Sequence, residues 1–143
     1  MKKAKIFYLI GSILLILVGV GHFFGQFEPK GLDIQRSLVE QAMKEYSFSG
    51  FGFQYSMIDV MQCWGVFFGV LMLVFGALNL LILFESLLPV SMIRFSLFNI
   101  AGLVILIFAG AIYVPFTAVG FSVVLLCFVV SAVLFYKKKK ENG

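Results

Sequence analysis

The side chains best suited to chemistry lie near the ends of apolar segments. His22 is the only histidine, and it lies in the apolar run 6–27 with Gln26 one helical turn further on. Asp59 and Gln62 stand at the start of the next apolar run, and Tyr113 stands at the end of the third. If these runs are antiparallel helices, all five side chains lie at a similar depth. We therefore predict one polar layer of candidate ligand-binding residues: His22, Gln26, Asp59, Gln62 and Tyr113.

Three roles are open for His22. An ionisable side chain inside a membrane segment is a functional candidate, because burying its charge in lipid is costly. The imidazole could form a structural hydrogen bond with Gln26, Gln62 or Asp59, or it could bind the polar headgroup of a ligand. It could also carry a proton or hold a metal, with Asp59 setting its charge state. From these patterns we assign no catalytic residue and no metal ligand.

A second polar layer is expected near the opposite helix ends. Asn79, Asn99 and Ser131 each lie several residues from the end of an apolar run. Amide side chains inside a membrane hold helices together through interhelical hydrogen bonds. We therefore interpret these three residues as a structural polar layer.

These residues require helices that cross a membrane. Hydrophobic residues make up 62% of the chain and charged residues 13%, whereas a soluble domain has about 25% charged residues. The uncharged run 64–84 is roughly 31 Å long as a helix, which matches the hydrocarbon core of a bilayer. We predict an all-α polytopic membrane protein, a four-helix bundle in a single domain, 1–143. The predicted spans are 6–27, 57–85, 92–114 and 118–136, followed by a basic tail at 137–143.

The first span has a second interpretation. Lysines before an apolar run are typical of a signal peptide, but no small-x-small cleavage site follows residue 27. We favour an uncleaved first span.

Small residues indicate which helix faces point inward. Lipid supplies no hydrophobic force between helices, so close approach at glycine must supply part of the packing. We predict packing roles for four glycines at helical spacing: Gly65, Gly69, Gly76 and Gly102. Gly19 and Gly21 lie off the predicted inward face of the first span and are candidates for self-association.

The segment 28–56 is the one long hydrophilic stretch. Pro29 and Gly31 end the first helix, and Asp33 can cap a short helix that continues to Tyr46. That helix is amphipathic, with a charged strip at Arg36, Glu40 and Lys44, and suits the membrane surface or the end of the bundle. The following residues, 48–55, alternate phenylalanine with small residues and suit an interfacial loop, either a connector or a lid.

The charges predict an orientation. Lysine and arginine gather at residues 2–5, at Arg94 and at 137–140, whereas acidic residues outnumber them on the other side. By the positive-inside rule, both termini lie in the cytoplasm and 28–56 lies outside. The net charge of +4 therefore reflects topology and does not indicate nucleic-acid binding.

Several chemistries lack the residues they need. There is no CxxC motif, and Cys63 and Cys127 are expected at depths too different for a disulfide. A single histidine provides no bis-histidine haem site within one chain; haem with a methionine or a symmetry-related histidine, or a quinone, stays open. We assign no cofactor. The absence of a mid-span acidic residue argues against the small multidrug exporters.

Two short motifs resemble a known family. Gly21–Phe24 reads G-H-F-F, and Gly76–Leu80 reads G-A-L-N-L in a glycine-rich span. In this layout the chain is similar to small bacterial inner-membrane proteins of the DoxX-like group. The resemblance implies a membrane subunit linked to redox or thiol-stress complexes, and it transfers no catalytic residue.

Two classes of function follow. The first is a non-enzymatic membrane protein: an accessory subunit, or a binder of a lipid-like or quinone-like amphiphile whose head meets the His22 layer. Its partners would be membrane lipids, other membrane subunits or a second copy. The alternative is a small membrane enzyme, an isomerase or a redox subunit, that uses His22 and Asp59 for proton handling.

Overall fold

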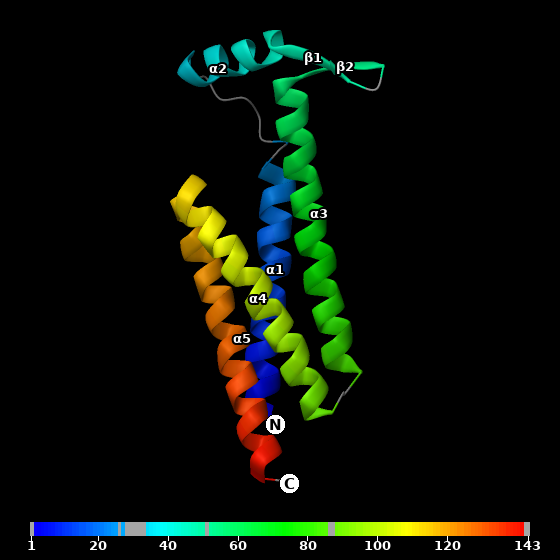
Figure 1. Ribbon diagram of the computed structural model, residues 1–143, viewed down its shortest axis with the longest axis vertical. Coiled ribbons are helices and arrows are strands. Elements are labelled where there is room, and N and C mark those ends of the chain that lie inside the picture. Colours follow the sequence, from blue (N-terminus) through cyan, green and yellow to red (C-terminus); the bar gives the residue numbers. More distant parts are fainter. Residues whose placement is uncertain (1, 26, 28–33, 51, 86–87, 142–143) are drawn as a thin grey trace. The chain divides into compact units, whose positions relative to one another are not determined.

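Five helices and one β-hairpin make up the described part of the chain. The computed structural model describes residues 2–25, 27, 34–50, 52–85 and 88–141, except for the side chain of Tyr113. In chain order the elements are α1 (Lys2–Gly25), α2 (Ile34–Glu45), β1 (Ser47–Gly50), β2 (Phe53–Ser56), α3 (Met57–Phe84), α4 (Pro89–Tyr113) and α5 (Pro115–Glu141) (Figure 1).

Four of the helices are long and apolar enough to cross a membrane: α1, α3, α4 and α5. Their outward side chains are apolar, and Phe84 and Phe108 are 73% and 71% exposed, as expected for surfaces that face lipid. The all-α, multi-pass class is therefore confirmed. α1 begins at Lys2 and α5 continues to Glu141, several residues beyond the predicted spans, because lysine is a good helix former.

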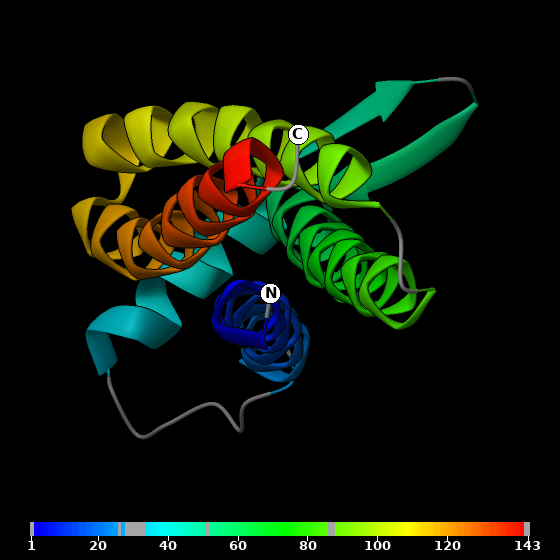
Figure 2. The same cartoon turned by 90° about the horizontal axis from the view of Figure 1, so that it is seen from below.

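The chain forms two compact units. The first unit comprises Met1–Leu17 and Val74–Gly143, and the second comprises Val18–Leu73. Segments of all four long helices meet in the first unit, where Tyr8 of α1 bonds Asn79 of α3, Asn79 bonds Asn99 of α4, and Ser131 of α5 bonds the Ala4 carbonyl. Figure 2 shows α4 and α5 side by side, with the start of α1 beside them. This unit is a four-helix bundle.

The core of the first unit follows a heptad-like spacing. The buried residues of α4 are Met92, Ser96, Asn99 and Leu103, and those of α5 include Phe121, Val124, Phe128, Ser131 and Phe135. Alternating steps of three and four keep these positions on one side of each helix. The large rings fill the interior, while the serines and asparagines provide its polar contacts.

One predicted packing glycine, Gly102 of α4, is not buried. Gly102 is exposed, and its neighbour Leu103 is buried instead. In α5, Gly120 is likewise exposed while Phe121 is buried. These helices are apolar all round, so hydrophobicity does not distinguish their faces. In α4 and α5, the presence of a glycine therefore did not identify the buried face of the helix.

The predicted interfacial loop at 48–55 is a hairpin. β1 and β2 pair antiparallel, with Phe48 opposite Tyr55 and Gly50 opposite Phe53. The Phe48 and Tyr55 rings meet edge to face with their centroids 4.8 Å apart, a stabilising cross-strand pair. Gly52 has φ 83°, a left-handed conformation that glycine adopts at no steric cost. The alternation of residue types was a strand signal.

Candidate functional site

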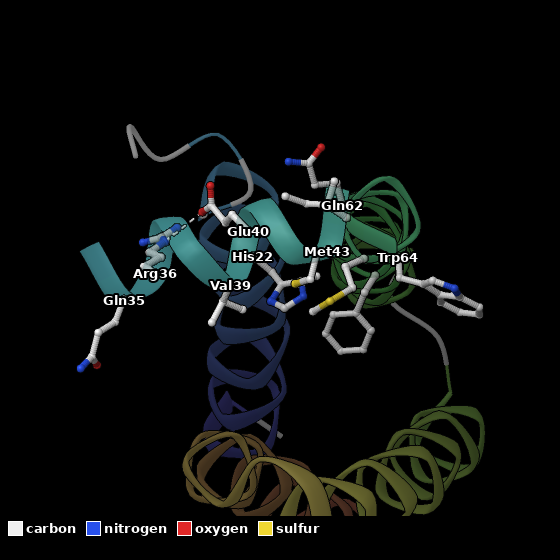
Figure 3. A pocket seen from close by; sticks show the side chains of 13 residues that line it. His22, Gln35, Arg36, Val39, Glu40, Met43, Gln62 and Trp64 are labelled. Atoms are coloured by element: carbon white, nitrogen blue, oxygen red, sulfur yellow. Dashed lines mark hydrogen bonds and ion pairs between the residues drawn. The ribbon is translucent and has the colours of Figure 1, made fainter. Parts of the chain in front are cut away.

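A cavity of about 980 Å³ lies in the second unit, and we call it the α2 cavity. The end of α1, the inner face of α2 and the start of α3 form its walls (Figure 3). Eight of its thirteen lining residues are apolar or glycine, so its walls suit a hydrophobic group. The lining residues are His22, Gly25, Gln35, Arg36, Val39, Glu40, Met43, Ile58, Met61, Gln62, Trp64, Gly65 and Phe68.

Two predicted binding residues, His22 and Gln62, line the α2 cavity. The His22 ring meets Phe68 edge-on, with centroids 4.9 Å apart and planes at 71°. This contact holds the imidazole against α3, and Figure 3 shows the ring on the same side of α2 as Met43. Gln26 lies outside the described residues, and so does the side chain of Tyr113.

The Asp59 carboxylate has a structural role at the start of α3. Its Oδ2 accepts hydrogen bonds from the Ser56 backbone N–H at 2.9 Å and from the Ser56 hydroxyl at 2.6 Å. Such reciprocal bonds stabilise a helix N-terminus. Asp59 lines a second cavity of about 620 Å³, which Gln62 also lines. The predicted single polar layer is thus divided between two cavities that share Gln62.

Sequence reasoning missed what α2 contributes to the cavity. The Arg36 Nε donates to Glu40 Oε1 at 3.2 Å, and the two side chains are 50% and 19% exposed. Val39 and Met43 line the cavity beside this pair. The charged strip at Arg36 and Glu40 was visible in the sequence, but nothing in the sequence indicated that it borders a cavity. The predicted cap at Asp33 lies outside the described residues.

Ile34 and Leu38 occupy a separate face of α2. They are 75% and 61% exposed and do not line the cavity, whereas Val39 does line it and is also 59% exposed. α2 therefore has a side that borders the cavity and a second apolar strip, and both are open. This is the pattern of a helix that lies in a membrane interface.

The predicted inner layer is present in the first unit, with a member that the sequence analysis missed. Asn79 Nδ2 donates to Asn99 Oδ1 at 2.8 Å, and Asn99 Nδ2 donates to Asn79 Oδ1 at 2.9 Å. The Tyr8 hydroxyl also donates to Asn79 Oδ1, at 2.6 Å, and Asn99 donates further to the Phe95 carbonyl. The Tyr8 ring meets Phe128 edge to face at 5.2 Å. We call Tyr8, Asn79 and Asn99 the inner polar cluster.

Buried serines accompany the cluster. Ser131 is fully buried and donates to the Ala4 carbonyl at 3.1 Å, so it links α5 to α1 and has a different acceptor from the asparagines. Ser12 donates to the Tyr8 carbonyl within α1. The fully buried Ser96 hydroxyl has no hydrogen-bond partner among the described residues. Burying the Ser96 hydroxyl therefore costs desolvation free energy that no hydrogen bond in the described chain offsets.

The glycines differ in their surroundings. A Cβ added at Gly69 would lie 2.9 Å from the Phe23 backbone nitrogen, and one at Gly76 would lie 2.5 Å from Ile16 Cγ1. Both glycines thus allow α1 and α3 to approach closely, and Gly65 is buried in the wall of the α2 cavity. A Cβ at Gly102 would meet nothing within 4 Å in the described chain, so its predicted packing contact is not formed here.

Gly19 also differs from its expected place. It was a candidate for self-association, but a Cβ there would lie 2.8 Å from the Gly69 carbonyl oxygen. Gly19 is therefore a packing residue, and α1 and α3 cross closely at Gly19 and Gly69. At Gly21 a Cβ would meet nothing within 4 Å.

The described residues bring together no group of three His, Cys, Asp or Glu side chains that could hold a metal ion. Cys63 is exposed, Cys127 is buried, and both are free thiols. The α2 cavity has mostly apolar walls and a few polar side chains, so it is suited to binding an apolar group with a polar head.

The chain was compared with known proteins by sequence and by fold. No protein-family model, no curated protein and no solved structure matches it. The case for a function therefore depends on the geometry of the α2 cavity.

Proposed function

We propose that this protein is a non-enzymatic membrane protein that binds a lipid-like amphiphile in the α2 cavity. The observation that carries the proposal is the composition of one cavity: apolar walls from Val39, Met43, Ile58 and Phe68 beside the polar His22, Gln62, Arg36 and Glu40. Its volume of about 980 Å³ is at the upper end of the range for ligand sites, about 300–1,000 Å³. An acyl or prenyl chain would lie against the walls, and its head would meet the polar side chains.

The place of action follows from the charges. We propose that both termini and the basic tail lie in the cytoplasm, because lysine and arginine gather at residues 2–5, Arg94 and 137–140. That the membrane is the cytoplasmic membrane of a bacterium is implied only by the DoxX-like resemblance. The α2 cavity would then open at the outer side. A reporter enzyme that works only in the cytoplasm should be active when fused to the basic tail, and one that works only in the periplasm should be inactive there. Activity of the periplasmic reporter would overturn this orientation.

The enzyme alternative has less support. It requires Asp59 to handle protons with His22, whereas the Asp59 carboxylate accepts two hydrogen bonds from Ser56 at the start of α3. The DoxX-like relationship and an accessory-subunit role stay predictions. Neither is needed for amphiphile binding.

A cavity-filling substitution tests the proposal. Gly25 lines the α2 cavity, and a Cβ there would meet nothing within 4 Å, so phenylalanine can enter the cavity without a backbone clash. Gly21 offers a matched control, because it lies on α1, is equally open and does not line the cavity. Gly21 lies inside α1 and Gly25 is its last residue, so the gain in helix propensity is larger at Gly21 and thermal unfolding must be measured for both variants.

The readout is lipid that remains bound after purification in mild detergent, measured by native mass spectrometry. Wild type and Gly21→Phe should retain the same bound amphiphile, and Gly25→Phe should lose it. Circular dichroism and thermal unfolding would establish that both variants fold. Equal retention by the two folded variants would refute binding in the α2 cavity.

A further inference from the structure

The polar part of the α2 cavity carries charges of both signs. Arg36 and Glu40 line the cavity from one face of α2, and the Arg36 Nε lies 3.2 Å from Glu40 Oε1 (Figure 3). The remaining polar lining residues are His22, Gln35 and Gln62. The pair thus brings one guanidinium and one carboxylate to the border of the cavity; in Figure 3 the Glu40 side chain lies on the other side of the α2 ribbon from His22 and Met43.

This arrangement discriminates between classes of headgroup. A purely anionic head would be attracted by Arg36 and repelled by Glu40. A purely cationic head would be attracted by Glu40 and repelled by Arg36. A neutral quinone-like head would leave the ion pair intact and gain nothing from it. A head with both charges can bind the guanidinium and the carboxylate together.

We propose that the amphiphile is a phospholipid whose head carries a phosphate and a primary ammonium group, as in phosphatidylethanolamine. This inference rests on the proposed amphiphile binding in the α2 cavity. The phosphate would bind Arg36, because the planar guanidinium donates two parallel hydrogen bonds to phosphate oxygens. The ammonium group would donate to Glu40, so the ligand would form one ion pair with each residue in place of the Arg36–Glu40 ion pair.

A primary ammonium fits better than a quaternary one. Proteins recognise quaternary ammonium groups with the faces of aromatic rings, most often tryptophan. The Trp64 indole is 67% exposed and points away from His22 and Met43 in Figure 3. The Phe68 ring is already in contact with His22. Glu40 instead offers a hydrogen-bond acceptor, which a choline head cannot use.

Lipid titration by native mass spectrometry tests the headgroup. Phosphatidylethanolamine, phosphatidylcholine and phosphatidylglycerol with identical acyl chains would be added to the full-length protein after delipidation. We expect wild type to prefer phosphatidylethanolamine over each of the other two by about fivefold or more, the effect of one to two partly exposed ion pairs.

Single charge removals test each contact. Glu40→Gln should abolish the preference for phosphatidylethanolamine over phosphatidylglycerol, because the repulsion and the ammonium contact are lost together. Arg36→Gln should weaken the binding of all three phospholipids by about fivefold, since each has a phosphate. Glu45→Gln is a matched control on the same helix that does not line the cavity, and it should behave as wild type.

The outcomes separate this inference from the proposed function. If bound lipid depends on Gly25 but the three headgroups bind equally, the proposed function stands and the headgroup assignment is overturned. If no lipid binding depends on Gly25, both fail. Soluble phosphoethanolamine is the last probe; if it binds as tightly as the phospholipid, then the occupant is a free metabolite and the lipid assignment is wrong.

Discussion

Replacing Asn79 with leucine removes the centre of the inner polar cluster. Asn79 makes three hydrogen bonds there: it accepts from Tyr8 and from Asn99, and it donates to Asn99. Leucine has a similar volume, so the substitution deletes the polar contacts with little change in packing. All five atoms of these hydrogen bonds lie at interhelical contacts of the first unit, where α1, α3 and α4 meet.

The magnitude follows from the number of bonds lost. Interhelical hydrogen bonds in membranes are worth about 0.6 kcal/mol on average, so three of them give a loss of about 2 kcal/mol. Tyr8→Phe deletes a single bond and keeps the ring contact with Phe128, so its cost should be about 0.6 kcal/mol. Tyr136→Phe, on the exposed side of α5, is the matched control and should cost nothing measurable.

The assay is a double-mutant cycle on the free energy of unfolding in detergent or bicelles, measured by steric trapping. The combination of Tyr8→Phe with Asn79→Leu should cost less than the two separate losses added together. The shortfall, about 0.6 kcal/mol, is the shared hydrogen bond.

Additivity within about 0.2 kcal/mol would show that Tyr8 and Asn79 do not interact, and the cluster as described would be wrong. A cost for Tyr8→Phe equal to that of Asn79→Leu would also contradict the reasoning. In that case the tyrosine hydroxyl alone would carry the stability of the cluster.

Three further predictions concern stability. Ser96→Ala should leave stability unchanged or raise it by up to about 1 kcal/mol, because it removes a buried hydroxyl without a partner in the described chain, whereas Ser131→Ala should lower it by about 0.6 kcal/mol. Gly76→Ala should destabilise the protein, because its Cβ would meet Ile16 at 2.5 Å and the Ser12 carbonyl at 2.9 Å, while Gly102→Ala should be neutral or stabilising in the same thermal unfolding assay. Asp59→Ala should lower the thermal midpoint, because it removes both hydrogen bonds from Ser56 at the start of α3, and Asp59→Asn should lower it less; equal thermal midpoints for Asp59→Ala and wild type would refute the capping role.

The sequence predicted the inner polar cluster only in part. Asn79 and Asn99 were recognisable because amides are rare and costly inside apolar helices, which restricts where they can lie. Tyr8 was not recognisable, because a tyrosine near the start of a span usually marks the membrane interface. Its role became clear only when α1 was seen to place the hydroxyl 2.6 Å from Asn79.

The candidate site was likewise predictable from the sequence only in part. His22 and Gln62 were expected in one polar layer, because helical spacing and depth follow from the sequence, and both line the α2 cavity. Arg36 and Glu40 were predicted as a charged strip without a target, because a hydrophilic segment between two spans can fold over either of its sides. Asp59 was expected beside His22, but it lines the second cavity with Gln62 and bonds Ser56 locally, and such local bonds are not visible from helical depth.

The number, length and apolar character of the long helices were determined by the sequence alone, because bilayer thickness and the need to satisfy backbone hydrogen bonds in lipid leave few alternatives. The tertiary structure decided which side of each helix is buried. Lipid and protein interior are equally apolar, so the inward face is set by shape and by a few hydrogen bonds. That is why Leu103 is buried where Gly102 was expected, and why the α2 cavity could be recognised only once α2 was seen beside α1 and α3.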